Sequence, residues 1–444
     1  MRRELFGTDG IRGVAGEYPL DSKTVAAVGV ALGQWIARNG RERKVVLGMD
    51  TRESGPALAA GIAGGLAAHR VAVDFAGVTT TPGVAYLAKN GPFAAGVIIS
   101  ASHNPFRDNG IKVLAHNGYK LPDEQEKSLE ADIFAAREEI EPAPADLTID
   151  NELDGSYVDH LAATLARGLA GLKIVADCAN GSASDLAPDL LRRVGAEVDA
   201  IGAAPNGRNI NLNCGSLHLD SLREHVLREN ADVGVAFDGD ADRALFVSSS
   251  GKIVDGDAVL LIAARFLKAQ GKLPGDTVVA TVMSNLGLER ALASHGIKLV
   301  RTPVGDKYVL EEMLRIGAAL GGEQSGHVIF REYATTGDGM LTALRVFEVM
   351  TASRQTLDQL SSELQVYPQK LVNIRVKERK PLEELVLVQE QIRAAEAAFA
   401  DSGRVLVRFS GTEPLARVMV EGADAAMVED WTERIAASIR QQLA

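Results

Sequence analysis

The sequence contains very little cysteine, which limits the scaffolds it can form. Only Cys178 and Cys214 occur in 444 residues. A disulfide framework needs more cysteines than this, and Cys214 has no second cysteine nearby with which to hold a structural zinc ion. The first residues also lack the apolar core of a signal sequence. We therefore expect a reducing, cytoplasmic location.

Long apolar runs and an excess of positive charge are missing as well. The most apolar stretch, residues 56–68, is rich in glycine and alanine and falls short of the roughly 20 residues that cross a bilayer. The net charge is −12, which argues against nonspecific binding to nucleic acid or to anionic membranes. An anionic substrate is not excluded, because the local charges of a site decide what binds there.

Glycine and chain length are what the sequence has in plenty. Glycine fills 44 of 444 positions, against a typical share of roughly 7%. At roughly 150 residues per domain, the length suggests about three domains. A short β-branched run, a helix-like stretch and a second short run recur in residues 44–76, 172–200 and 277–300. This alternation predicts three similar α/β domains with largely parallel sheets.

The last part of the chain has a different pattern. Residues 372–376 alternate apolar and polar side chains, which predicts a half-buried strand. A helix is expected from Pro381 to about residue 400, with proline in its first turn. One apolar face of a final helix would be formed by Val428, Trp431, Ile435, Ile439 and Leu443. Together these elements predict a small α+β domain.

Three carboxylates follow a strand-like run at residues 233–237. Asp238, Asp240 and Asp242 occupy alternate positions and would repel one another unless a cation neutralised them. Hard oxygen ligands of this kind suit Mg²⁺. A calcium loop is excluded, because its sixth position is Arg243 and not glycine. A phosphatase with Asp238 as nucleophile and a solvated acidic turn remain alternatives.

A serine loop follows another apolar run, residues 96–99. Ser102 and His103 come next and are closed by Asn104-Pro105, which ends the strand. Ser102 is therefore expected at the carboxyl end of a strand, where open α/β sheets place their sites. The flanking glycines of a hydrolase nucleophile elbow are absent. A polar loop with a capping serine is the alternative.

Residues 322–327, Gly-Glu-Gln-Ser-Gly-His, form a third candidate loop. Glu323 and Ser325 stand two positions apart, so that both side chains can face the same way and hold two sugar hydroxyls. On its own the motif also fits an ordinary polar turn.

Several basic residues complete the set of candidates. Arg408 follows a strand in residues 407–414, and with two hydroxyls, exposed amides and Arg417 it would form an oxyanion cradle. Arg12 stands between glycines, and Lys112 would approach Ser102 if the chain turned back at a nearby glycine. Surface ion pairs or plain turns are the alternatives for each. A phosphate ester of a sugar would use a serine, a hard metal, a hydroxyl-binding loop and a phosphate cradle together.

On these four loops, in this order, the chain resembles the α-D-phosphohexomutase superfamily along essentially its whole length. The matching segments are residues 100–105 for the phosphoserine loop, 238–243 for the metal loop, 322–327 for the sugar loop and 408–414 for the phosphate-binding loop. Within the superfamily it is most similar to the bacterial members that act on glucosamine phosphates. That similarity rests on residues 6–12, 108–112 and 209–216 and on Gln324.

The resemblance implies a fold and a reaction. It implies three α/β/α domains with mixed, largely parallel sheets at residues 1–152, 153–251 and 252–366, and a TATA-binding-protein-like α+β domain at 367–444, around one cleft. It implies interconversion of glucosamine 6-phosphate and glucosamine 1-phosphate, through a phosphoserine and a 1,6-bisphosphate, on the route to cell-wall precursors. A phosphomannomutase/phosphoglucomutase and a metal-dependent sugar phosphatase remain open as alternatives.

The resemblance also implies roles for individual residues. Ser102 would carry the phosphoryl group and, with Asp238, Asp240 and Asp242, hold one Mg²⁺ per chain. Lys112 or His103 would handle the proton of the substrate hydroxyl, beside Arg12. The implied substrate-binding residues are Arg243, Glu323, Ser325, His327, Arg408, Ser410, Gly411, Thr412 and Arg417. A hexosamine or glucose 1,6-bisphosphate would prime the serine, and the expected partners are a phosphosugar and a second copy of the chain.

Overall fold

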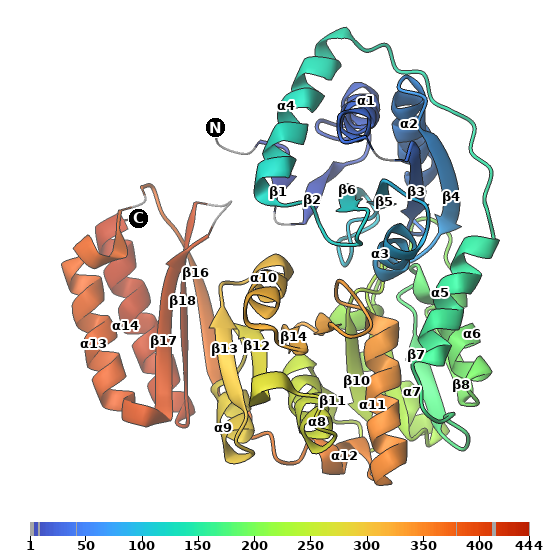
Figure 1. Ribbon diagram of the computed structural model, residues 1–444. Helices are drawn as coiled ribbons and strands as arrows, with labels where there is room; N and C mark the ends of the chain where they lie inside the picture. The colour runs from blue at the N-terminus through green and yellow to red at the C-terminus, as the bar shows by residue number, and fades with distance from the viewer. Residues whose placement is uncertain (1–3, 8, 41, 379, 411–413, 444) are drawn as a thin grey trace. The chain divides into compact units, whose positions relative to one another are not determined.

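The computed structural model describes residues 4–7, 9–40, 42–378, 380–410 and 414–443 (Figure 1). The chain divides into two compact units. The first unit contains the residues up to 283 and residues 299–362, and the second contains residues 284–298 and those from 363 onward. Within the described ranges, no helix has the length and apolar character needed to cross a membrane.

The first sheet of the first unit runs in the order β1-β2-β6-β5-β3-β4. Its strands are β1 Phe6–Gly7, β2 Gly10–Val14, β3 Lys44–Met49, β4 Ala72–Val78, β5 Ala95–Ile99 and β6 Asp108–Ala115. Strand β3 pairs in parallel with β4 and β5, whereas β6 is antiparallel to β2 and β5. Its helices are α1 Ser22–Arg38, α2 Gly55–Ala67, α3 Thr81–Asn90 and α4 Asp123–Glu139.

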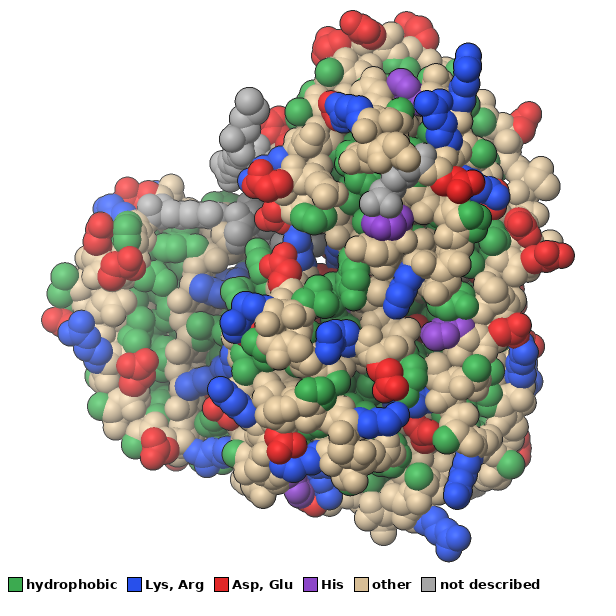
Figure 2. Space-filling view, in the orientation of Figure 1, with side chains coloured by type: hydrophobic (Ala, Val, Ile, Leu, Met, Phe, Trp, Pro, Cys, Tyr) green, Lys and Arg blue, Asp and Glu red, His purple; other side chains and the backbone are tan. Residues whose placement is uncertain are grey.

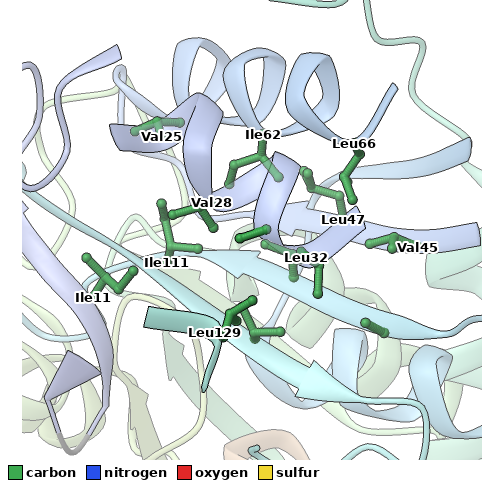
Figure 3. Packing of buried hydrophobic residues seen from close by; sticks show 14 of the residues in the cluster. Ile11, Val25, Val28, Leu32, Val45, Leu47, Ile62, Leu66, Ile111 and Leu129 are labelled. Atoms are coloured by element: carbon green, nitrogen blue, oxygen red, sulfur yellow. The ribbon is translucent and has the colours of Figure 1, made fainter. Parts of the chain in front are cut away.

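Helices α1 and α2 approach each other closely because glycines face each other at their contact. A Cβ atom on Gly29 would lie 2.1 Å from the carbonyl oxygen of Ile62, and one on Gly65 would lie 2.2 Å from that of Ala26. The aliphatic residues around this contact form the main core of the sheet (Figure 3). They include Val25, Val28, Leu32, Val45, Leu47, Ile62, Leu66, Ile111 and Leu129. Part of the glycine excess therefore serves helix packing.

The second sheet runs in the order β11-β10-β9-β7-β8. Its strands are β7 Lys173–Asp177, β8 Glu197–Ile201, β9 Val233–Phe237, β10 Ala244–Ser248 and β11 Ile253–Val254. Strand β7 is parallel to β8 and β9, and β10 is antiparallel to β9 and β11. The helices of this part are α5 Glu152–Ala163, α6 Ala183–Arg193, η1 Gly215–Leu217 and α7 Asp220–Glu229.

The third sheet runs in the order β13-β12-β14-β15. Its strands are β12 Thr277–Thr281, β13 Lys298–Thr302, β14 Leu320–Gly322 and β15 Val328–Phe330. Strand β14 pairs in parallel with β12 and antiparallel with β15. The helices of this part are α8 Gly256–Ala269, η2 Pro274–Asp276, α10 Asp306–Ile316, α11 Gly339–Ser353 and α12 Leu357–Leu360. On the face seen in Figure 2, acidic and basic side chains are interspersed.

The second unit is built on an antiparallel sheet with β18 in the centre, in the order β16-β18-β17. Its strands are β16 Gln369–Arg375, β17 Gly403–Phe409 and β18 Leu415–Gly422. Its helices are α9 Leu286–Ser294, η3 Leu382–Glu384, α13 Val386–Phe399, η4 Ala400–Ser402 and α14 Ala425–Leu443.

Sequence periodicity predicted most of this second unit. In β16, Ile374 is buried between exposed neighbours, as the alternation predicted. The final helix is confirmed as α14, with Val428, Ile435, Ile439 and Leu443 in the core. The start of the preceding helix was predicted too early, because Pro381 and Leu385 have non-helical backbone angles and α13 begins only at Val386. The predicted fold class, three mixed α/β sheets with helices followed by a smaller α+β part, is confirmed.

Candidate active site

Ser102 lies at the carboxyl end of β5, as predicted, in a left-handed backbone conformation with φ of 53°. Its Oγ donates a hydrogen bond of 2.5 Å to Oδ2 of Asp238 and lies 3.2 Å from Nδ1 of His103. The side chain is buried. Residues 238–243, which follow β9 in the second sheet, form the acidic loop. The structure thus joins the serine of the first sheet to Asp238, the first carboxylate of this loop.

A buried aspartate holds the serine loop from the neighbouring strand. The hydroxyl of Ser100 donates a bond of 2.6 Å to Oδ2 of Asp50 and accepts one of 2.9 Å from the backbone N–H of Ser102. Asp50 follows β3, the parallel neighbour of β5. Sequence reasoning missed Asp50, although its position after a parallel strand places it at the same sheet edge as Ser102.

The backbone of the serine loop is fixed from two further directions. Nη2 of the fully buried Arg52 donates to the carbonyl oxygens of Ser102 and Asn104, at 3.0 and 2.9 Å. Nδ2 of Asn211 donates to the same two oxygens, at 2.9 and 3.1 Å. A Cβ atom on Gly239 would lie 2.5 Å from the Ser102 carbonyl, so only glycine permits this approach. Arg52 and Asn211 were not predicted.

Asp238, Asp240 and Asp242 form a compact buried cluster. Each offers a carboxylate oxygen within 4.8 Å of the others. Oδ1 of Asp240 and Oδ1 of Asp242 are buried and have no hydrogen-bond partner among the described residues. Such oxygens are costly unless a ligand satisfies them. The hard donor set and these open oxygens fit a divalent cation such as Mg²⁺.

The pKa values of the cluster reflect burial and mutual repulsion. Burial, followed by the neighbouring carboxylates, raises the pKa of Asp238 and of Asp242. Burial acts in the same direction on Asp240, but Lys112 and a 2.5 Å hydrogen bond from the Thr81 hydroxyl outweigh it and lower the pKa of Asp240 to about 2. Neighbouring positive charge therefore stabilises the charged form of Asp240.

Lys112 reaches this cluster from β6. Its Nζ lies 2.9 Å from Oδ2 of Asp240, 3.1 Å from Oδ2 of Asp9 and 3.7 Å from Oδ2 of Asp242. Burial alone would lower the pKa of Lys112, but these carboxylates raise it overall. The chain turns back as predicted but before Gly110, which lies within β6; this strand returns antiparallel to β5, and the Gly110 carbonyl accepts a bond from Ser100 N–H.

Two arginines and a histidine surround the serine. Arg12 is hydrogen-bonded to Asp9 through its guanidinium. The guanidinium of Arg243 lies 4.0 Å from Asp238 and 3.8 Å from Asp242. Burial and these two arginines lower the pKa of His103 to about 4. The serine hydroxyl therefore has a neutral imidazole and two guanidinium groups in its neighbourhood at neutral pH.

The predicted sugar loop connects β14 and β15. Oε1 of Glu323 accepts a bond of 3.2 Å from the backbone N–H of Gly305, and Ser325 is exposed. Burial raises the pKa of Glu323 against the charges of His327 and Arg243. The two loops lie side by side, since the N–H of Ala244 after the acidic loop donates a bond of 3.1 Å to the Gly326 carbonyl of the sugar loop.

Two other residues of this loop face neighbouring elements. His327 is buried, and its Nε2 lies 3.7 Å from Oδ2 of Asp306. Nε2 of Gln324 donates a bond of 3.1 Å to Oδ2 of Asp255, which caps the amino end of α8. The Gln324 amide therefore ties the sugar loop to the amino end of α8.

The predicted phosphate cradle lies in the second unit. Arg408 of β17 stands directly opposite Arg417 of β18 in the antiparallel register. Burial and Arg417 lower the pKa of Arg408, since like charges opposite one another are unfavourable. Ser410 is buried and its N–H donates 2.8 Å to the Leu415 carbonyl. Gly411 and Thr412 lie outside the described residues.

Models of known families match the chain in four consecutive parts. The phosphoglucomutase/phosphomannomutase α/β/α domains I, II and III match residues 3–140, 155–251 and 255–367, and the C-terminal domain matches residues 371–438. The chain belongs to the phosphoglucomutase/phosphomannomutase family. The resemblance inferred from the four loops is therefore confirmed.

Individual members of this family are similar over the whole chain. The phosphoglucosamine mutase of Solibacter usitatus is 59% identical over 100% of both chains. A phosphoglucomutase/phosphomannomutase family protein from Burkholderia thailandensis has a solved structure with a TM-score of 0.80, at 26% identity over 97% of this chain and 96% of that one. N-acetylphosphoglucosamine mutase of Aspergillus fumigatus, solved with GlcNAc-6P and magnesium, has the same fold, with a TM-score of 0.65 at 18% identity over 99% and 96% of the chains.

Proposed function

We propose that the chain interconverts glucosamine 6-phosphate and glucosamine 1-phosphate through a phosphoserine at Ser102. The observation that carries the proposal is the 2.5 Å hydrogen bond from Ser102 Oγ to Asp238, which sets a buried serine against a cluster that fits a divalent cation. The choice of an amino sugar is supported by full-length relatives at 44–59% identity that are named phosphoglucosamine mutase.

The proposed metal is one Mg²⁺ per chain, held by Asp238, Asp240, Asp242 and an oxygen on Ser102. The open buried oxygens of Asp240 and Asp242 support this assignment. When bound, the ion supplies positive charge that neutralises the transferring phosphoryl group. The Aspergillus fumigatus neighbour with this fold was solved with magnesium and a sugar phosphate.

In the proposed reaction, Ser102 starts with a phosphoryl group. The free hydroxyl of the substrate attacks phosphorus, a new P–O bond to the sugar forms, and the bond to Ser102 Oγ breaks. The hydroxyl proton passes through a nearby base to Ser102 Oγ, and Ser102 is left as the free serine beside a sugar 1,6-bisphosphate. Ser102 Oγ then attacks the other phosphate and gives up its proton to the base, the bond from that phosphate to the sugar breaks, and the proton passes to the released sugar oxygen. A hexosamine or glucose 1,6-bisphosphate would load the serine at the start.

The chain's other residues bind and orient in this scheme. Lys112 and His103 are the two candidates for the proton transfer. The guanidinium groups of Arg12 and Arg243 add positive charge around the reacting phosphate. The proposed sugar and phosphate contacts are Glu323, Ser325, His327, Arg408, Ser410, Gly411, Thr412 and Arg417. We place the boundaries of the four domains near residues 152, 251 and 366.

The test compares wild type with Ser102→Ala, and uses Ser156→Ala, an exposed serine of α5, as the matched control. Isomer formation from glucosamine 6-phosphate, glucose 1-phosphate and mannose 1-phosphate is measured beside release of inorganic phosphate. We expect wild type and Ser156→Ala to form glucosamine 1-phosphate, with intact mass showing phosphoserine, and Ser102→Ala to form none. Full mutase activity in Ser102→Ala would refute the phosphoserine. Phosphate release without isomer would favour a phosphatase.

A further inference from the structure

Asp9 is a carboxylate on which several cationic side chains converge, although the sequence singled out only its neighbour Arg12. Oδ1 of Asp9 accepts a bond of 2.7 Å from Nζ of Lys120, and Oδ2 lies 3.1 Å from Nζ of Lys112. The guanidinium of Arg12 is bonded to the same Oδ2. Burial raises the pKa of Asp9, but these cations outweigh it and hold the pKa well below its usual range.

Through Lys112, the charged side chains around Asp9 are connected to the acidic cluster of Asp238, Asp240 and Asp242. The Lys112 side chain is 2% exposed and lies within 4 Å of Asp240, Asp242 and Asp9. Asp240 and Asp242 belong to the carboxylates that would hold a metal ion. Among the carboxylates that the structure places around Lys112, Asp9 alone stands outside that set.

Through Lys120, the same side chains are connected to the part of the chain that carries the sugar loop. Nζ of Lys120 lies 2.6 Å from Oδ2 of Asp306, the first residue of α10. Asp306 in turn faces His327 of the sugar loop at 3.7 Å. Charges therefore alternate along Asp240, Lys112, Asp9, Lys120 and Asp306, and each of these side chains is at most 25% exposed.

We propose that Asp9 is a positioning residue that holds Lys112 in its reactive geometry, with Lys120 and Asp306 as its anchor. This inference rests on the proposed function. A lysine is a point charge on a flexible stem, so a fixed partner decides where the ammonium stands. Misplacement of a reacting group by about 1 Å costs on the order of 100-fold in rate.

The first experiment measures kcat and KM for Asp9→Asn and Asp9→Glu. The control is Asp74→Asn, which removes one side of the Lys44–Asp74 pair of 2.7 Å on the same sheet. Asp9→Asn is expected to lower kcat by about 30- to 300-fold with KM changed less than about threefold, since the sugar and phosphate contacts remain. Asp9→Glu should retain part of the kcat that Asp9→Asn loses, and Asp74→Asn should have the kcat and KM of wild type.

A double-mutant cycle shows whether Asp9 acts through Lys112. In a Lys112→Met background, Asp9→Asn should lower kcat by less than about threefold further, because no ammonium remains to be positioned. If the double variant loses kcat by the full product of the losses of the two single variants, the proposal is overturned. Lys120→Met leaves the Asp9–Lys112 contact in place, and its expected loss is smaller, about 3- to 10-fold.

Thermal unfolding of the same variants separates this proposal from failure of the proposed function. A stability coupling between Asp9 and Lys112 is expected whether or not a phosphosugar turns over. Stability coupling without coupling in kcat would mean that Asp9 is merely structural, and would overturn the inference. If wild type were inactive on every phosphosugar, the proposed function would be refuted, and with it the kinetic role of Asp9. If Asp9→Asn fails to fold, Asp306→Asn is measured in its place. A loss in kcat is expected, and an unchanged kcat would contradict the role of Asp306 as an anchor.

Discussion

Tyr157 Oη donates a hydrogen bond of 2.8 Å to Oδ2 of Asp338, and both side chains are buried. Asp338 also caps α11 by accepting a bond of 2.9 Å from the backbone N–H of Leu341. The phenol from α5 therefore helps to satisfy a carboxylate whose pKa burial has raised to about 6. This contact joins α5 to the start of α11, where the N–H of Gly339 donates a bond of 2.9 Å to the Ala241 carbonyl of the acidic loop.

Tyr157→Phe removes that donor and leaves a buried carboxylate oxygen less well satisfied. We expect the free energy of unfolding to fall by about 1–3 kcal/mol. Urea unfolding at neutral pH measures the change, with Tyr308→Phe as the control because Tyr308 is 40% exposed. Equal stability of Tyr157→Phe and Tyr308→Phe would contradict the role given to this hydrogen bond.

Asp154 gives a prediction about pH. Burial raises its pKa from 3.8 to about 6, although the Thr79 hydroxyl donates to it at 2.5 Å. Between about pH 4 and pH 6 the folded protein keeps a proton at Asp154 that the unfolded chain has lost, so stability falls as pH rises through this window. Asp154→Asn keeps the acceptor and removes the ionisation. At pH 7 it should stabilise by up to about 2 kcal/mol.

The measurement for Asp154→Asn is urea unfolding at about pH 4 and at pH 7, on either side of the window. The gain should be present at pH 7 and absent near pH 4. Asp146→Asn, at an exposed position between α4 and α5, serves as the control. A gain of the same size at both values of pH would show that folding does not suppress the ionisation of Asp154 in the way described.

Removal of divalent metal provides a third prediction. Without a cation, Asp238, Asp240 and Asp242 repel one another, so Mg²⁺ at about 100 times its Kd should stabilise wild type by about 2.7 kcal/mol. Asp242→Asn should lose most of this gain. In the presence of a chelator, however, it should be as stable as wild type or more so, because one buried charge is gone. Thermal unfolding with and without Mg²⁺ measures both effects, and a destabilised Asp242→Asn in chelator would count against the repulsion.

The Arg408–Arg417 pair predicts opposite effects on binding and on stability. Arg408→Met should raise KM by about 10- to 100-fold while changing kcat less, because it removes charge-assisted contacts to the phosphate that does not react. The same change should stabilise the ligand-free protein by about 0.2–1 kcal/mol, since it removes a like charge from a cross-strand pair. Arg434→Met, on the exposed side of α14, is the control. Unchanged KM would refute the cradle.

Local patterns predicted much of this molecule because they depend on neighbours in the sequence. The acidic loop is a single stretch after a buried strand, and helix α14 shows its core face in its own spacing. Asp9, Lys120 and Asp306 could not be found in this way, because they are far apart in the chain. Their contacts exist only because β2 and β6 are paired and because Asp306, at the start of α10, accepts a bond from Lys120 in the same unit.

The long-range contacts of the third repeat leave no sign in its sequence. Its helix α9 forms where predicted and groups with the second unit. Nothing in the helix itself indicates this grouping. Its N-cap residue, Asn285, also donates to the Tyr367 carbonyl at 3.0 Å and accepts from the N–H of Tyr367 at 2.9 Å. Such long-range bonds decide the grouping and leave no periodic trace in the sequence.

The contact between Gly239 and the carbonyl of Ser102 has a consequence for motion. The Ser102 hydroxyl donates to Asp238, and the hydroxyl and backbone N–H of Thr81 both donate to Asp240, so the first sheet and the acidic loop cannot separate without breaking several hydrogen bonds at once. The two segments are therefore expected to move together as one rigid unit. A reaction that needs a bisphosphate to turn over must therefore obtain its freedom of movement from other segments, while the serine and its carboxylates keep their spacing throughout the cycle.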